Sequence, residues 1–145
     1  VLGDFCGSQI TGDMGEIEFD RYCTQNNISS YSARSAAAPI DRIIVTKTGE
    51  TIKVHVKASI RVKDSKGGEK YIFHTHKSLI LADYYFCVGI NKTNYSSDFI
   101  LWIPFEMGKN RRLQIRVSCL DKFSEYLKPP AKITDAANIL QFPCP

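Results

Sequence analysis

The most restrictive feature of the sequence is a strict alternation of apolar and polar side chains from Thr51 to Lys63. Because successive side chains of a β-strand point to opposite faces of its sheet, this pattern predicts one long strand with a buried face and a wet, basic face. The apolar residues are Ile52, Val54, Val56, Ala58, Ile60 and Val62. The polar residues are Lys53, His55, Lys57, Ser59, Arg61 and Lys63.

Turn-forming residues lie at both ends of this strand. Thr48-Gly49 precedes it, and the run from Asp64 to Gly68 follows it. Glycine tolerates positive φ at little cost, so both segments are typical of hairpin turns. We therefore expect residues 41–47 and 69–77 to be antiparallel neighbours of the strand.

Three further strands are predicted later in the chain. Residues 79–90 and 98–105 are apolar on both alternating faces, which is typical of central strands covered on both sides. Residues 112–117 alternate again and predict a half-buried strand with a basic outer face.

Helical signals are confined to the C-terminal part, at residues 120–127 and 133–140. The first of these segments ends before Pro129-Pro130, and Thr134 is a candidate cap for the second. Residues 24–39 show no period and predict a long loop. The pattern as a whole favours an all-β, mainly antiparallel sandwich or barrel with one or two short helices near the C-terminus.

The length of the chain limits it to one domain. A chain of 145 residues with 43% hydrophobic content can form one core but not two comfortable ones, so we expect a single domain over residues 1–145. No apolar run approaches the roughly 20 residues of a membrane span, and none is predicted.

Five cysteines indicate an oxidising environment, because none lies in the close pairs typical of a structural zinc site. The preferred pairing joins Cys6 to Cys23 and Cys87 to Cys119. It leaves Cys144 for a covalent dimer or for a cysteine further along a longer chain. The competing pairing joins Cys6 to Cys144, and the sequence does not choose between them.

Three N-glycosylation motifs point to the same compartment. They begin at Asn27, Asn91 and Asn94, and the last two lie almost back to back in a polar segment. Together with the cysteines, they predict a secreted, disulfide-bonded, extracellular glycoprotein.

The opening residues resemble the start of CUB domains. That family begins with Cys-Gly, then Thr-Gly, then a Gly and an Ile that lead into the first strand. The chain has Cys6-Gly7, Thr11-Gly12, Gly15 and Ile17 in that order. A later segment is similar to the aromatic strand, turn and strand of the family, through Trp102-Ile103-Pro104, Gly108, Leu113, Ile115 and Val117. The resemblance implies an extracellular β-sandwich used for protein recognition. Cys23 departs from the family's placement of its second cysteine, and no calcium site is carried over.

The basic faces of the two half-buried strands are the first candidate binding surface. Side chains on one face stand about 6.6 Å apart, a spacing that an anionic glycan or an acidic protein patch can follow. The alternative is that these charges only keep a sheet soluble and discourage edge pairing. The candidate binding residues are Lys53, Lys57, Arg61, Lys63, Arg112 and Arg116.

Trp102 is a second candidate binding residue. It is an exposed aromatic anchor if its strand is an edge, and a core residue if its strand is central. The sequence leaves both readings open.

Catalytic motifs are absent, so the chain is not expected to be an enzyme, and no cofactor is expected. The alternative is a small secreted enzyme with a metal site on the sheet (His55, His74 and His76) or a carboxylate site (Glu16 and Glu18). A net charge of +4 is too small to indicate a nucleic-acid partner, and none is expected outside the cell. We therefore predict a secreted binding protein for an extracellular protein or an anionic glycan, including a pathogen effector that acts on its host.

Overall fold

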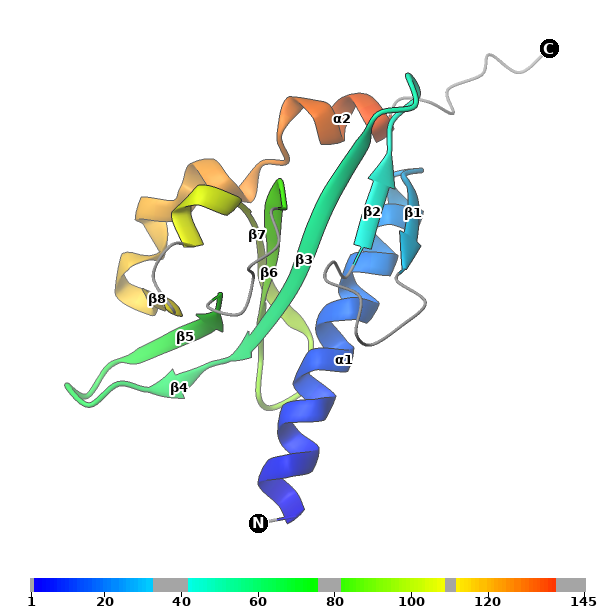
Figure 1. Ribbon diagram of the computed structural model, residues 1–145. Coiled ribbons are helices and arrows are strands. Elements are labelled where there is room, and N and C mark those ends of the chain that lie inside the picture. The colour runs from blue at the N-terminus through cyan, green and yellow to red at the C-terminus, as the bar shows by residue number, and fades with distance from the viewer. Residues whose placement is uncertain (1, 33–41, 76–81, 109–111, 138–145) are drawn as a thin grey trace.

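The computed structural model describes residues 2–32, 42–75, 82–108 and 112–137, with side chains from residue 10 onward. The chain opens with a long helix, continues through eight described strands and ends in short helical segments (Figure 1). The helices are α1 (Leu2–Gln25) and α2 (Ala131–Ala137), with the 3-10 segments η1 (Phe105–Gly108) and η2 (Val117–Leu127). The strands are β1 (Ser29–Ser32), β2 (Arg42–Val45), β3 (Thr51–Ile60), β4 (Val62–Lys63), β5 (Glu69–His74), β6 (Tyr84–Ile90), β7 (Ser97–Pro104) and β8 (Arg112–Arg116).

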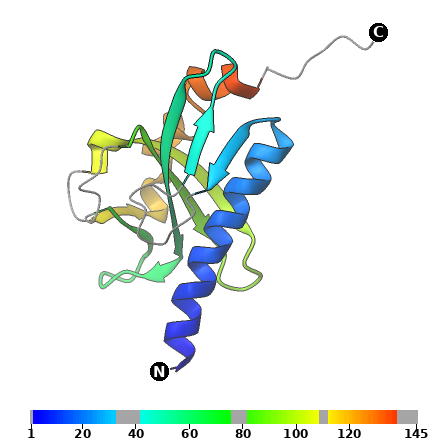
Figure 2. The same ribbon diagram turned by 45° about the vertical axis from the view of Figure 1, so that its right-hand side comes forward.

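The strands form two sheets, and the larger one is mixed. Its order is β1-β2-β3-β6-β7, and β3 runs parallel to β6. The smaller sheet has the order β4-β5-β8 and is antiparallel. Helix α1 lies across one face of the larger sheet, as the two views show (Figures 1 and 2). The all-β, mainly antiparallel prediction is therefore wrong, and the fold is mixed α/β.

Two cores lie on the two faces of the larger sheet. The core beneath α1 contains Phe19, Val54, Phe86 and Trp102. The other core joins the larger sheet to the smaller sheet and to η2, and it includes Tyr71, Phe73, Tyr85, Cys87, Leu101, Ile103 and Ile115. Strands β6 and β7 contribute to both cores, which confirms that they are covered on both sides.

Helix α1 occupies the region where no helix was expected, including the segment that resembles the first strand of CUB domains. The side of the helix that faces the sheet has the buried Gly15, Glu18, Phe19 and Cys23 and the half-buried Tyr22, which follow the helical spacing of three and four residues. Most of these residues are small, polar or only partly apolar, whereas Ile10 and Ile17 are exposed. The apolar stripe that normally marks a helix is therefore weak in the sequence.

The end of α1 explains the first glycosylation motif. The N–H of Ile28 donates to the carbonyl of Cys23 (2.8 Å), and the N–H of Asn27 donates to that of Thr24 (3.3 Å). With Asn27 at a φ of 55°, this is a left-handed helix cap, a role that suits asparagine.

The second and third motifs lie in the turn between β6 and β7. The N–H of Thr93 donates to the side-chain oxygen of Asn91 (2.8 Å), and the N–H of Ser96 donates to that of Asn94 (3.0 Å). Asparagine is favoured in such turns for this hydrogen bond. The three motifs are thus accounted for by local backbone chemistry.

The predicted disulfides are absent, since Cys23, Cys87 and Cys119 carry free thiols. Cys6 and Cys23 both lie in α1, about 25 Å apart along the helix axis, so they cannot be bridged. Cys144 lies outside the described residues. The free thiols correct the prediction of a disulfide-bonded protein, and the extracellular location stays a prediction. No described helix is long and apolar enough to cross a membrane.

The long predicted strand exists, but it bends at Arg61 and passes from the larger sheet into the smaller one as β3 and β4. Its antiparallel pairing with β2 and β5 is confirmed. The prediction of a solvent-exposed polar face is wrong in the middle of β3. There His55 stacks on Tyr85, and Ser59 accepts a hydrogen bond from the N–H of Ile72 (2.9 Å). The predicted strand at residues 112–117 and the two C-terminal helical segments are also present, as β8, η2 and α2.

Candidate functional site

A cluster of charges lies where α1 crosses the start of β2, and we call Glu16, Asp20 and Arg42 the Arg42 cluster. The Nη1 atom of Arg42 lies 3.5 Å from the Oε1 atom of Glu16, and its Nε atom lies 3.4 Å from the Oδ1 atom of Asp20. The side chain of Arg42 is 12% exposed, whereas those of Glu16 and Asp20 are 45% and 58% exposed. A nearly buried cation is therefore bordered by two carboxylates that solvent can reach.

Backbone geometry positions this cluster. A Cβ atom on Gly15 would lie only 2.8 Å from the Cβ of Ala58, so the absence of a side chain lets α1 approach β3 closely. Glu16 and Asp20 are four residues apart and share one side of the helix. Arg42, the first residue of β2, pairs with Val54 of β3. This is the last residue pair between the two strands. Beyond Val54, β3 pairs only with β6 in the part of the chain that the structure describes, so the Arg42 cluster lies where the β2–β3 pairing ends.

The Arg42 cluster combines two kinds of chemistry. A guanidinium binds phosphate or carboxylate oxygens through parallel N–H donors, and exposed carboxylates accept protons or bind cations. In this structure the guanidinium already contacts both carboxylates. Within the described residues, no three His, Cys, Asp or Glu side chains are grouped to hold a metal ion. We therefore assign no metal centre to the cluster.

The sequence pointed to the wrong carboxylate pair. Glu16 and Glu18 would share a face only in a strand, and α1 is a helix. Glu18 is nearly buried and forms an ion pair with Arg21 at 2.9 Å. The sequence analysis did not identify Asp20 and Arg42. The spacing of Phe19, Tyr22 and Cys23 is a weak signal of a helix, and in a helix Glu16 and Asp20, four residues apart, share one side.

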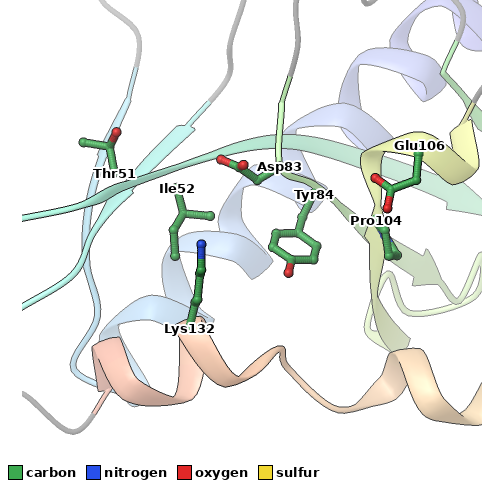
Figure 3. A pocket seen from close by; sticks show the side chains of 7 residues that line it. All are labelled: Thr51, Ile52, Asp83, Tyr84, Pro104, Glu106 and Lys132. Carbon is green, nitrogen blue, oxygen red and sulfur yellow. The ribbon is translucent and has the colours of Figure 1, made fainter.

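A polar cleft of about 220 Å³ lies between the start of β3, the start of β6, η1 and α2 (Figure 3). Lys132 extends from α2 toward β3, and Tyr84 extends from β6 toward α2. The carboxylate of Asp83 accepts the N–H of Lys53 (2.8 Å), so its role here is to join two strands. The volume is below the roughly 300–1,000 Å³ of common ligand pockets. The lining residues are Thr51, Ile52, Asp83, Tyr84, Pro104, Glu106 and Lys132.

The predicted basic stripe on β3 is interrupted. Lys53 is exposed and Lys57 is half-buried, but the buried His55 lies between them on the same face. Arg61 lies at the bend, where its Nε atom is 3.2 Å from the Oε2 atom of Glu69. Lys63 is exposed but belongs to β4, in the smaller sheet.

Arg112 and Arg116 are both exposed on β8. Trp102, by contrast, is 2% exposed and packs against Phe86 and Tyr22 in the core beneath α1. Strand β7 is an edge by hydrogen bonding, but both of its faces are covered, so Trp102 is not an exposed anchor.

The three histidines do not converge in the described structure. His55 is buried against Tyr85 and Phe105, whereas His74 is exposed on β5. His76 lies outside the described residues. The structure therefore gives no support to a histidine metal site.

No family model matches the chain, and no curated protein matches it. Among solved structures, the chain is similar to the bacterial homing endonuclease I-Ssp6803I. The two are 14% identical, with a TM-score of 0.55 over 74% of each chain. The fold is therefore of the mixed α/β kind found in that endonuclease.

The mixed fold and the free thiols correct the functional predictions. A secreted β-sandwich that binds proteins or glycans does not agree with a mixed sheet, free thiols and the fold of an endonuclease. The exclusion of a nucleic-acid partner finds no support in this comparison, because the similar structure is that of a homing endonuclease. The similar structure is that of an enzyme, so the prediction of a non-enzyme is not supported either.

Proposed function

We propose that this chain binds nucleic acid and hydrolyses phosphodiester bonds at the Arg42 cluster. The observation that carries the proposal is the fold shared with a bacterial homing endonuclease over 74% of both chains. The cluster supports it because it combines a phosphate-binding group with solvent-exposed carboxylates.

Each side chain has a role in this proposal. Arg42 is held in place by its two carboxylate partners, and its guanidinium stabilises the negative charge that develops on the phosphoryl oxygens. Glu16 accepts a proton from the attacking water. The oxygen of that water forms a bond to phosphorus, the bond from phosphorus to the leaving oxygen breaks, and the leaving oxygen takes up a proton from solvent. Asp20 keeps Arg42 oriented when Glu16 turns toward the substrate.

The test is a cleavage assay on plasmid DNA with the full chain, in the presence of Mg²⁺ and in the presence of EDTA. We expect nicking or linearisation by the wild type. We expect Glu16→Gln to lower the rate by about 10²-fold or more, the usual size of a general-base effect, without lowering affinity for DNA. Glu50→Gln is the matched control, because Glu50 is an exposed glutamate in the turn between β2 and β3.

Two results would contradict the proposal separately. No affinity for any nucleic acid would rule out the binding role. Binding without cleavage under both conditions, or a wild-type cleavage rate in Glu16→Gln, would rule out hydrolysis at this cluster.

A further inference from the structure

The smaller sheet has one apolar face and one basic face. Tyr71 and Phe73 of β5 and Ile115 of β8 point inward to the core that the two sheets share. Their neighbours along each strand must point outward. The outward residues are Lys70, Ile72 and His74 on β5, and Arg112, Gln114 and Arg116 on β8. We call Lys70, His74, Arg112 and Arg116 the basic face.

Basic residues oppose each other across this pair of strands. Lys70 pairs with Arg116, and His74 pairs with Arg112. Directly opposite side chains have Cβ atoms about 5 Å apart, and two like charges at that distance, as on Lys70 and Arg116, destabilise a sheet. A sheet selected for stability or solubility alone would alternate the two signs. The positive charge gathered on this face can be offset by an anionic partner.

One carboxylate partly offsets these charges. Asp64, in the turn between β4 and β5, lies 3.1 Å from the Nε atom of Arg116 and 3.6 Å from the Nζ atom of Lys70. Burial acts to raise the pKa of the Asp64 carboxyl, but Arg116 and Lys70 outweigh it and hold that pKa below its usual value. Asp64 therefore stays ionised and orients two cations while neutralising one.

The remaining charge on this side of the sheet is positive. Arg112 is exposed and has no acidic partner among the residues that the structure describes. Lys66 is exposed in the turn that joins β4 to β5, which projects from the body of the molecule (Figure 1). Glu69 does not reduce this charge, because it alternates with Lys70, lies on the other face and pairs with Arg61.

We propose that the basic face is the surface on which double-stranded DNA docks. This inference rests on the proposed function and names its partner and the surface that holds it. Arg112 and Arg116 are four residues apart on one strand face, which places them about 13 Å from each other. The major groove of B-DNA is about 12 Å wide and admits a two-stranded β-ribbon. The two arginines can thus contact the phosphates on both sides of one groove.

The composition of the basic face favours a duplex over a single strand. Proteins that bind single strands stack the bases on aromatic rings, but the aromatic residues of β5, Tyr71 and Phe73, point inward. The centre of the outward face carries Ile72 and Gln114 instead. An RNA duplex fits less well, because its major groove is deep and too narrow for side chains to read.

The test is fluorescence anisotropy with a short labelled DNA duplex, measured over a series of salt concentrations. Each lost phosphate contact lowers the dependence of log affinity on log salt by about 0.9. We therefore expect the double variant Arg112→Ala/Arg116→Ala to bind more weakly, with a slope reduced by about 2. The matched control is Lys92→Ala/Lys122→Ala, which removes two exposed cations from the β6–β7 turn and η2 and should leave the slope unchanged. Fluorescence of the buried Trp102 checks that both variants are folded.

The outcomes separate this inference from the proposed function. If the wild type binds duplex DNA and the arginine double variant keeps its slope, the basic face is not the docking surface, while the proposed function stands. Tighter binding of single-stranded DNA or duplex RNA would contradict the choice of partner. If the wild type binds no nucleic acid at all, the proposed function is itself wrong.

Discussion

Burial determines what the individual cysteines of this protein can do. Cys23 lies beneath α1 and Cys87 lies inside β6, whereas Cys119 in η2 is partly exposed. Burial raises the pKa of the Cys23 thiol to about 11 and raises that of Cys87 even further. The thiolate is the reactive form, so both buried thiols should be inert near neutral pH.

Alkylation of the folded protein near pH 8 should therefore modify Cys119 well before Cys23 or Cys87. Raising the pH should increase the reactivity of Cys23 only as it approaches about 11, because the thiol stays protonated below its pKa. Peptide mass mapping over time would measure the three rates, and the unfolded protein is the control in which they should converge. Equal rates for Cys87 and Cys119 in the folded protein would contradict the structure.

At the scale of elements, the position of α1 depends on one close approach to the sheet. Gly15 lies against Ala58 and Val56 of β3, and the next residue, Glu16, reaches Arg42. Gly12 lies one turn earlier in the same helix, where an added Cβ would meet no atom within 4 Å. The two glycines are therefore a matched pair with opposite expectations.

Gly15→Ala should lower the free energy of unfolding by about 1–3 kcal/mol, because the new methyl group forces α1 away from β3. Gly12→Ala should raise it by up to about 1 kcal/mol, because alanine is the better helix former and the site is open. Urea unfolding would measure both changes. An unchanged stability in Gly15→Ala would mean that α1 does not pack as closely as the structure shows.

At the scale of the whole molecule, a buried tyrosine ties the two sheets together. The hydroxyl of Tyr71, in β5 of the smaller sheet, donates to the carboxylate of Asp98 at the start of β7 in the larger sheet, at 2.6 Å. The Nε–H of Arg61, at the bend between β3 and β4, donates to the same hydroxyl at 3.3 Å. The smaller sheet also carries the basic face, so this link orients it relative to the Arg42 cluster.

Tyr71→Phe should lower the free energy of unfolding by about 1 kcal/mol, the usual net value of one hydrogen bond, because Asp98 is exposed and can be solvated instead. Tyr95→Phe is the control, since Tyr95 is an exposed tyrosine in the β6–β7 turn and its loss of a hydroxyl should change nothing measurable. Fluorescence of Trp102, the single tryptophan of the chain, reports unfolding in both variants. Equal midpoints for the two variants would show that the link contributes nothing.

The candidate site could not be derived from the sequence, because it depends on contacts between segments that are distant in the chain. Arg42 meets Glu16 and Asp20 only because α1 crosses β3 at Gly15, a contact between segments more than 40 residues apart. The sequence predicts only part of the basic face, because the alternation along residues 112–117 places Arg112 and Arg116 on one side of a strand. Lys70 and His74 belong to the basic face only because β5 pairs with β8, which the sequence does not show.

By itself, the sequence determined the course of most strands and turns, since alternation along a strand and the preferences of Gly and Asn in turns are properties of neighbouring residues. It did not reveal α1, whose sheet-facing side is formed by Gly, Glu, Cys and a half-buried Tyr around a single Phe. Only the tertiary structure decided that β3 lies parallel to β6, that the thiols stay apart and that charged side chains form the Arg42 cluster and the basic face. Those outcomes depend on contacts between segments distant in the chain, and a local pattern carries no information about which segments meet.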